Sequence, residues 1–538
     1  MNSAATDVQT FDYVIVGAGA AGGVLASKLS EDPNVTVCVL EAGPPDRHPM
    51  IHIPAGFTKI YANSAYTWTF ETEPTPQTAG RSVHLVQGKT LGGSTSVNGM
   101  VFVRAQRGDF DKWPKAGNSG WSYAEVLPYF KALETRLNGN PEWRGRTGPM
   151  NIGDVRWRDP ACNAFIEAAI ENGMPLNPDY NGSVQKGVSF TQTAIAKRRR
   201  ISSATAFLHP AMKRPNLRVV TEALANRILF QGKRATGIQY TRGDQSFVAV
   251  ARKEVIISAG TINTARLLQV SGVGDPELLS QLGVPVVNPL KGVGSNFQDH
   301  YLCSVVAAGK NFVSINQLGI GPRLWWQIAR YFLGAKSILE LPPPLIHWFL
   351  NSKGDEGDAD IQGVFSPASN NLGQSGKLDT SAGMTGAFWQ HRPQSKGYVK
   401  AVSTRIADAP IVQPNYLQHE TDRAVVLAGY RMMRLLLGSR ALSPFVKAET
   451  SPGADIQTDD ELLDFAARTG GTAYHFTGTA KMGLADDPTS VVDTQLRVHG
   501  MTGLRVADAS IIPHMISGNT QATTLMIGLK AADLIRNQ

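Results

Sequence analysis

FDYVIVGAGAAG, at Phe11–Gly22, carries the strongest structural signal in this chain of 538 residues. The apolar stretch Tyr13–Val16 predicts a strand, and the glycines after it lead into a helical pattern, which is the order of a nucleotide-binding βαβ unit. In such a unit the glycines permit the tight turn, the approach of the backbone to a pyrophosphate and the close packing of helix on strand. The phosphates lie at the positive end of the helix. The residues expected to contact them are Gly17, Gly19, Ala20, Ala21 and Gly22.

A second predicted strand, Val35–Leu40, ends at Glu41. An acidic side chain at this point accepts hydrogen bonds from an adenosine ribose and disfavours a 2′-phosphate. Glycine turns also close loops for purely structural reasons, but here strand, helix and acid are in register. We therefore predict dinucleotide binding, with Glu41 and Ala42 beside the ribose.

A second glycine-rich segment, GKTLGGSTSVNGMVFVRA at Gly88–Ala105, distinguishes a flavin from a nicotinamide. It resembles the first signature of the glucose-methanol-choline (GMC) oxidoreductase family, and this resemblance implies FAD. Some members bind their flavin covalently through a histidine in this signature, but Val97 stands there in this chain, so we expect non-covalent FAD. The matching residues are Gly88, Lys89, Leu91, Gly92, Gly93, Ser94, Thr95, Val97, Asn98, Phe102 and Ala105.

The resemblance spans nearly the whole chain. It includes GTINTARLLQVSGVG at 260–274, with Ala265 departing from the second signature, GVGSNFQDH at 292–300, HFTGTAKMG at 475–483 and GLRVADASIIPHMISGNTQATT at 503–524. It implies a two-domain α/β (α+β) fold, with a Rossmann-like FAD-binding domain and a substrate domain built on an antiparallel sheet. The expected FAD-binding pieces are 10–150, 189–312 and 471–538, and the expected substrate-binding pieces are 151–188 and 313–470.

By position, the resemblance also implies which residues contact the FAD. These are Gly88, Leu91, Gly92, Gly93, Ser94, Asn98, Gly99, Val101, Ala225, Ala259, Gly260, Asp508, Ala509, Asn519 and Thr520. Two of them have alternative interpretations, because Ala225 fits an ordinary strand residue and Asp508 fits a helix cap. The final helix, expected at about 522–535, would direct its positive end toward the flavin.

Two residues are expected to carry the chemistry. His475, in AYHFTGT, occupies the position of the family's catalytic histidine, and a histidine suits a base that titrates near working pH. Asn519, in SGNTQ, stands at the partner position and can donate a hydrogen bond to a developing alkoxide. Phe476 replaces the proline of many members without removing this chemistry. Without the resemblance, any one histidine is more often structural than catalytic.

Composition narrows the possible partners. The 52 basic and 44 acidic residues give a formal charge of +8, dispersed except for the run Lys197–Arg200, which we interpret as a solvated loop rather than a nucleic-acid site. The three cysteines form neither a metal-ligand pattern nor a disulfide framework. No apolar run is long enough to span a membrane. A cytoplasmic protein without a metal site or a nucleic-acid partner is expected.

The aromatic segment Leu318–Leu350 is the part least similar to the family. Trp325, Trp326, Tyr331 and Phe332 fit a hydrophobic entrance or a membrane contact, although core packing of a helix produces the same spacing more often.

The expected reaction is FAD-dependent oxidation of a primary alcohol to an aldehyde, by proton abstraction and hydride transfer to flavin N5, on a small or aromatic alcohol. Alternatives are a sugar, polyol or choline-type dehydrogenase of the same family, or a hydroxynitrile lyase that retains FAD without redox chemistry. The sequence does not distinguish oxygen from a quinone as electron acceptor, and it leaves the oligomeric state open.

Overall fold

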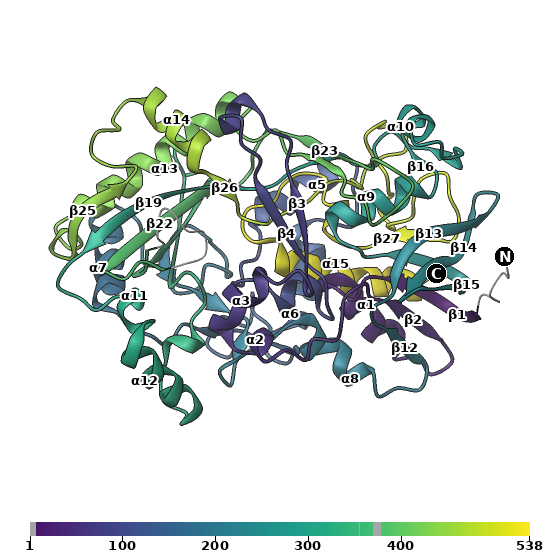
Figure 1. Ribbon diagram of the computed structural model, residues 1–538, viewed down its shortest axis with the longest axis horizontal. Helices are drawn as coiled ribbons and strands as arrows, with labels where there is room; N and C mark the ends of the chain where they lie inside the picture. Colours follow the sequence, from purple (N-terminus) through teal and green to yellow (C-terminus); the bar gives the residue numbers. More distant parts are fainter. Residues whose placement is uncertain (1–6, 355, 370–377) are drawn as a thin grey trace.

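Two sheets of seven strands, one toward each end of the molecule, organise the chain (Figure 1). The computed structural model describes residues 7–354, 356–369 and 378–538. Each sheet has its own hydrophobic core, and long loops and short helices connect the two.

The first sheet is the dinucleotide-type sheet. Its order is β12-β2-β1-β15-β14-β13, with β27 also paired to β15. Strands β12, β2, β1, β15 and β27 run parallel, while β13 and β14 form an antiparallel hairpin at Gly232. The bounds are β1 Asp7–Val16, β2 Val37–Leu40, β12 Leu217–Val220, β13 Leu224–Gln231, β14 Arg234–Arg242, β15 Gln245–Ile257 and β27 Leu504–Val506.

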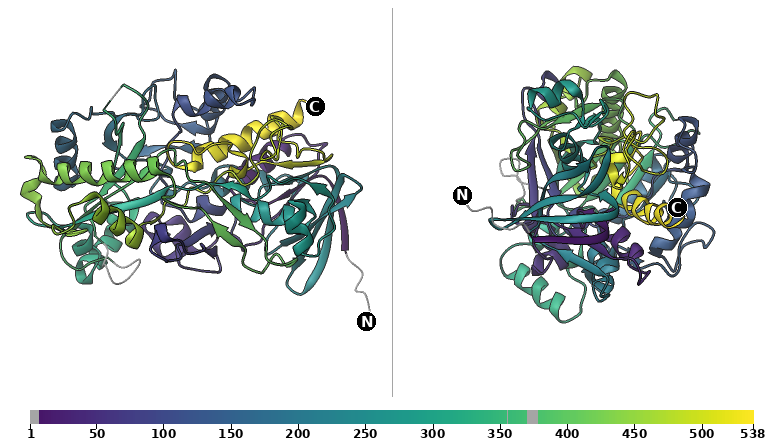
Figure 2. Two further views of the ribbon diagram at one scale, coloured as in Figure 1. Left: turned by 90° about the horizontal axis from the view of Figure 1, so that it is seen from above. Right: turned by 90° about the vertical axis from the view of Figure 1, so that its right-hand side faces the viewer.

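Helices α1 (Ala20–Leu29) and α15 (Thr520–Arg536) pack against each other beside this sheet, and α15 also contacts α6 (Tyr123–Leu133). The contact is close, because a Cβ on Gly528 of α15 would lie 2.6 Å from the carbonyl oxygen of Ala21 in α1. Figure 2 shows α15 running beside the sheet toward the C-terminus. This packing brings the N-terminus of α15 to the middle of the molecule.

The second sheet is antiparallel throughout, in the order β25-β19-β22-β21-β20-β8, with β26 beside β19. Helix α13 (Glu420–Gly438) packs on β22, β19 and β21. The two-domain α/β architecture with an antiparallel second sheet, expected from the sequence, is thereby confirmed. The bounds are β8 Gly187–Phe190, β19 Tyr301–Gly309, β20 Ile346–Leu350, β21 Ile361–Ser366, β22 Gly383–Gln390, β25 Val446–Ser451 and β26 Gly471–Thr472.

Among the remaining elements, those that position the site or its surroundings are α2 (Pro49–His52), α3 (Phe57–Tyr61), β3 (Thr67–Glu71), β4 (His84–Gly88), α9 (Thr261–Val270), α12 (Gly321–Phe332) and α14 (Asp459–Thr469). No helix in the described part of the chain is long and apolar enough to cross a membrane.

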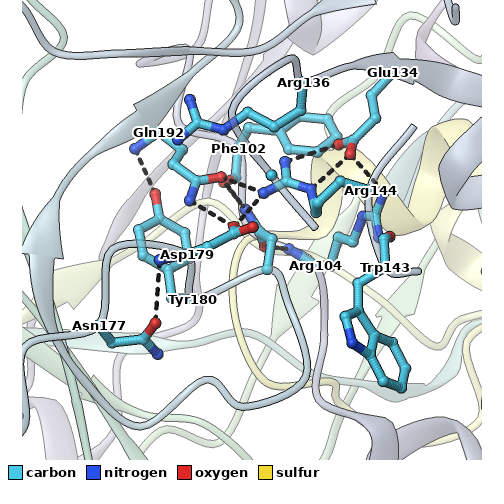
Figure 3. A network of polar contacts seen from close by, with 12 residues as sticks. Phe102, Arg104, Glu134, Arg136, Trp143, Arg144, Asn177, Asp179, Tyr180 and Gln192 are labelled. Carbon is cyan, nitrogen blue, oxygen red and sulfur yellow. Dashed lines mark hydrogen bonds and ion pairs between the residues drawn. The ribbon is translucent and has the colours of Figure 1, made fainter. Parts of the chain in front are cut away.

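A buried ionic network fixes the second glycine-rich segment at its C-terminal end (Figure 3). The Glu134 carboxylate accepts ion pairs from Arg104 at 2.8 Å and from Arg144 at 2.6 Å, and Arg144 also pairs with Asp179. The Arg104, Glu134 and Arg144 side chains are at most 1% exposed. Because Arg104 belongs to the signature segment, the network ties that segment to the loops around 134–192.

Two expectations about exposed segments need correction. Trp325, Trp326 and Phe332 on α12 are 73%, 59% and 74% exposed, so core packing is wrong for these three side chains. Arg200 is 2% exposed, so the solvated-loop interpretation holds for Lys197 and Arg199 but not for Arg200. Arg200 lies on a short hairpin strand, where alternation turns its side chain to the opposite side from Arg199.

Candidate active site

The two glycine-rich segments meet. The Gly92 amide donates to the Ala18 carbonyl oxygen at 2.8 Å, and the Ser203 hydroxyl donates to the Gly19 carbonyl oxygen at 3.0 Å. Gly93 has φ +51°, and a Cβ there would lie 2.8 Å from the Gly19 Cα. The contact therefore requires glycine at position 93, and it joins the two motifs into one surface.

This surface fits the pyrophosphate of a dinucleotide. Gly19 is the N-cap of α1 and supplies no side-chain cap, so the first-turn N–H groups of this helix remain available to an anion. A Cβ on Gly19 would enter open space, with the Gly93 Cα 4.0 Å away as its nearest neighbour. Such a cradle beside a helix N-terminus is the arrangement that phosphate binding requires.

Glu41 lies beyond the end of β2, as its position in the sequence predicts. Its carboxylate accepts the Ala18 amide and the Gly43 amide, both at 2.9 Å. Burial raises the pKa of Glu41 to about 7. Each carboxylate oxygen retains acceptor capacity, which suits the hydroxyl donors of a ribose.

Buried polar groups around Asn98 also lack partners. Asn98 accepts from Arg200 at 2.8 Å and donates to Gln521 at 2.5 Å. Within the described residues, Arg200 Nη2 and Gln521 Nε2 are buried and have no hydrogen-bond acceptor. Burial lowers the pKa of Arg200 to about 9. Orphaned donors beside the signature segment fit the polar acceptors of a bound flavin.

Asp508 acts as the helix cap that the sequence offered as the alternative to a cofactor contact. Its carboxylate caps a short 3₁₀ helix by accepting the Ser510 amide at 2.8 Å, and it also accepts the Gly260 amide at 2.8 Å. It thereby joins the end of β27 to the start of α9, next to Ala259. Ala225 lies in β13 and is buried, opposite Tyr240. Cofactor contacts by these residues remain predictions.

The remaining predicted cofactor residues lie in the same region. Gly88, Leu91, Gly99 and Val101 belong to the second glycine-rich segment, Ala42 follows Glu41, Ala509 follows Asp508, and Thr520 begins α15. Ser94 accepts the Gly88 amide at 3.0 Å and is exposed.

His475 and Asn519, predicted as a pair, are brought together: Asn519 Nδ2 lies 2.8 Å from His475 Nε2. Asn519 is the N-cap of α15, yet its side chain does not cap the helix but points to the histidine. Asn519 therefore does not cap the first-turn N–H groups of α15, for which no side-chain acceptor is found within the described residues, and these groups begin next to the histidine–asparagine pair.

The pair belongs to a ring of hydrogen bonds. His475 Nδ1 lies 2.8 Å from His300 Nδ1, and His300 Nε2 lies 2.8 Å from the carbonyl oxygen of His391. On the other side, Gln362 Nε2 donates to Asn519 Oδ1 at 3.1 Å, and Gln362 Oε1 lies 3.3 Å from His391 Nε2.

The ring determines which nitrogen of His475 carries the proton. A carbonyl oxygen only accepts, so His300 Nε2 donates to His391 and His300 Nδ1 is an acceptor. His475 Nδ1 must then donate to His300, which leaves Nε2 as an unprotonated acceptor for the Asn519 amide. Burial lowers the pKa of His300 to about 4, and burial together with the neighbouring histidines lowers the pKa of His475 well below its usual value. Both rings are therefore neutral at neutral pH.

Two carboxylates hold the ring from outside. Asp299 accepts the His475 amide at 2.8 Å and the Tyr416 hydroxyl, and burial raises its pKa to about 6. Asp109 accepts the Ser517 amide at 3.0 Å, two residues before Asn519, and pairs with Arg392, the residue after His391. Asp299 therefore fixes the backbone at His475, and Asp109 fixes the backbone just before Asn519 and connects it to the residue after His391.

Aromatic side chains surround the histidine. The Trp389 ring centroid lies 5.7 Å from that of His475. Tyr474 contacts the hydroxyl of Tyr61 on α3 and packs edge-on against Phe476. Tyr474 has φ +63° and is 41% exposed. Trp389 therefore gives the His475 ring an apolar neighbour in addition to its polar partners.

The sequence analysis did not identify Gln362, His300, His391 or Asp109 as functional residues. His300 lies within GVGSNFQDH, which was noted as a resemblance without a role. The other three carry no local motif: Gln362 lies in β21, His391 follows β22, and Asp109 lies in the short helix α4 (Arg107–Phe110). Nothing in the sequence around Asp109 indicates that its carboxylate accepts the amide of Ser517, some four hundred residues later in the chain.

The parallel sheet with its glycine turn defines a dinucleotide-binding fold, and the histidine–asparagine pair lies at the head of α15. Family models described as GMC oxidoreductase match residues 11–302 and 393–528. The chain belongs to the GMC oxidoreductase family. It is an FAD-dependent oxidoreductase of the type that acts on CH–OH donors.

Similar proteins cover almost the entire chain. An oxygen-dependent choline dehydrogenase of Brucella anthropi is 39% identical over 537 residues, covering 97% of this chain and 95% of the relative. The mitochondrial choline dehydrogenase of Homo sapiens is 38% identical over 546 residues, covering 98% and 90%. Among solved structures, pyridoxine 4-oxidase from Mesorbium loti superposes with a TM-score of 0.89 at 28% identity, covering 98% and 99%. A formate oxidase variant from Aspergillus oryzae, described in terms of its FAD modification, gives 0.90 at 26% identity, covering 99% of each chain.

Proposed function

We propose that this protein oxidises a primary alcohol to an aldehyde, with His475 as the base and Asn519 as the donor that stabilises the alkoxide. The observation that carries the proposal is the unprotonated Nε2 of His475, held 2.8 Å from the Asn519 amide at the head of α15. Alcohol oxidation requires a base that removes the hydroxyl proton and a hydrogen-bond donor that stabilises the alkoxide oxygen, and the two groups must lie side by side.

The bound alcohol would insert its hydroxyl between these two groups. Its proton passes to His475 Nε2, while Asn519 Nδ2 donates to the oxygen that becomes negative. His475 Nδ1 continues to donate to His300 Nδ1, which keeps the imidazolium oriented. FAD, when bound, accepts the carbinol hydride at N5.

Binding of the FAD would use the joined glycine segments for its phosphates, Glu41 for its ribose and the N-terminus of α15 for the flavin. We propose that the FAD is non-covalent, because Val97 offers no nucleophilic atom. The substrate domain would consist of 151–188 and 313–470 and the FAD domain of 10–150, 189–312 and 471–538, although β19, which lies at 301–309, pairs within the second sheet.

The proposed substrate is a small or aromatic alcohol, since Trp389 offers an apolar surface next to the base. A choline-type alcohol is the second candidate. Two relatives named choline dehydrogenase favour it, and aromatic faces attract a quaternary ammonium group. The electron acceptor would be oxygen or a quinone.

The test is the absorbance of the yellow holoenzyme, mixed anaerobically with benzylic, aliphatic, sugar and amino alcohols including choline, and then exposed to air. Bleaching by benzylic or small alcohols supports the first candidate, and bleaching by choline alone supports the second. If no alcohol bleaches the flavin while a hydroxynitrile is cleaved, the oxidation is refuted in favour of a lyase.

A further inference from the structure

An exposed aromatic face on α12 and a cluster of cations beside it are not explained by alcohol oxidation. Helix α12 stands out from the body of the molecule at the lower left of Figure 1, near α2 and α3. Trp325, Trp326, Phe332 and the following Leu333 are 73%, 59%, 74% and 79% exposed. Large apolar side chains gathered at this exposure mark an interaction surface.

The exposed side chains share one side of the helix. At 3.6 residues per turn, Phe332, Trp325, Ala329, Leu333 and Trp326 fall within an arc of about 120°. The opposite arc faces the protein: Gln327 is buried, and its carbonyl and side-chain oxygens accept from Ser337 Oγ at 2.8 Å and from the Ile338 amide at 3.2 Å. The helix is therefore held in place by its polar and half-buried side, and its aromatic side is presented to the surroundings.

Cations border this aromatic arc. By the same helical spacing, Arg323 and Arg330 follow directly after Trp326 around the helix. Residues 318–339 contain no aspartate or glutamate, and Lys336 adds a further exposed cation. An amphipathic helix with tryptophan and phenylalanine on one side and basic residues at its edges is the pattern of a helix that lies in a membrane interface.

The basic run of the sequence lies against the same helix. The Arg198 guanidinium lies over the Tyr331 ring at 4.7 Å and donates to the Ala335 carbonyl oxygen at 2.9 Å. Tyr331 in turn donates to the Arg198 carbonyl oxygen at 2.9 Å. Arg198 itself pairs with Glu340 at 3.5 Å, but Lys197 and Arg199 on either side of it are exposed, so this turn adds two exposed cations near the C-terminal end of α12.

We propose that this face, formed by α12 with Leu333 and the turn Lys197–Arg199, docks the enzyme on the surface of a bilayer that contains anionic phospholipids. The aromatic side chains enter the headgroup region and the cations contact the phosphates. A lipid surface can bind the aromatic side chains and the cations at the same time, because the anionic headgroups lie at the depth where tryptophan side chains are most stable.

The experiment is co-sedimentation of the FAD-loaded enzyme with vesicles of phosphatidylcholine alone and of phosphatidylcholine with phosphatidylglycerol, at low and high salt. We expect binding to the anionic vesicles that weakens as salt rises. Trp325→Ala with Phe332→Ala should weaken binding at least about tenfold, and Arg323→Gln about fivefold.

The matched control is Leu435→Ala, which removes an exposed leucine from α13; this helix lies at the upper left of Figure 1, whereas α12 lies at the lower left. It should bind as the unaltered enzyme does, and flavin absorbance and melting temperature establish that every variant is folded. The proposal is overturned if the enzyme stays in solution with anionic vesicles at low salt, or if the double variant binds equally well. It is also overturned if sedimentation velocity shows a dimer that the double variant dissociates, since the face would then join two copies of the chain.

Discussion

Gln362 positions Asn519, and replacing it by leucine isolates that role. Gln362 is fully buried in β21, and its Nε2 donates to Asn519 Oδ1 at 3.1 Å. This bond keeps the amide of Asn519 turned so that Nδ2 faces His475. Once a substrate hydroxyl occupies His475 Nε2, Gln362 is the group that maintains this orientation.

Gln362→Leu removes one neutral hydrogen bond from Asn519, worth about 1–1.5 kcal/mol. If that energy appears in the transition state, the rate of flavin reduction falls about 5–10-fold. Asn519→Ala removes the donor itself and should cost about 100-fold or more. In the Asn519→Ala background, Gln362→Leu should have no further effect on the rate, because the group that it orients is absent.

The assay is anaerobic stopped-flow reduction of the flavin by the alcohol that the bleaching panel identifies. Thr191→Val is the control, because Thr191 makes a buried 2.8 Å contact with His347 outside the ring and its loss should lower stability alone. A positioning role for Gln362 is excluded if the Gln362→Leu variant reacts at the unaltered rate. It is also excluded if Gln362→Leu slows the Asn519→Ala variant by the same factor as it slows the unaltered enzyme.

Three further predictions concern the cofactor cradle, the buried ions and pH. Gly93→Ala should lower the FAD content of the purified protein, because its Cβ would lie 2.8 Å from the Gly19 Cα, whereas Gly453→Ala, which also has positive φ but open space, should retain FAD. Glu134→Ala leaves Arg104 and Arg144 buried without their shared carboxylate and should lower the free energy of unfolding, measured in urea, by about 3–5 kcal/mol. A loss below about 1 kcal/mol would contradict the stabilising role of the network. The control is Asp464→Ala, which breaks an exposed pair with Arg468 and should have only a small effect. Burial lowers the pKa of His300 to about 4 and of His347 to about 3, and those of His391 and His475 well below their usual value, so the unfolded chain binds more protons than the folded one below about pH 6.5. Asp299 and Glu41, with pKa values raised to about 6 and about 7, act in the opposite direction and offset about two of those four protons. The melting temperature should therefore fall as pH decreases from about 6.5 to 4.5, and a constant or rising value would contradict the burial of these histidines.

Local patterns predicted the parts of the fold in which neighbouring residues cooperate. The strand, glycine turn and helix at the N-terminus form as expected, with β1 at Asp7–Val16 and α1 at Ala20–Leu29. In each case the spacing of apolar residues and glycines within a few turns of chain determines the conformation.

The ring of hydrogen bonds around His475 could not be predicted in the same way. Its members come from β21, from loops next to β19, β22 and β26, and from the N-cap of α15, and polar residues such as Gln362 and His391 have no periodic or motif signal that would bring them together. Trp325 shows the related limit for helices, because an aromatic stripe has the same spacing whether it faces a core or the solvent. Only the packing of Gln327 on the opposite side distinguishes the two.

We propose that neutral His475 accepts the alcohol proton, and flavin reduction in His475→Ala is the decisive experiment. The measurement is the anaerobic rate of flavin reduction by the bleaching alcohol in the unaltered enzyme and in His475→Ala, with and without added imidazole. We expect the variant to retain FAD, to react about 100-fold or more slowly, and to recover part of its rate with imidazole. Reduction of the variant at the unaltered rate would contradict the assignment of His475 as the base.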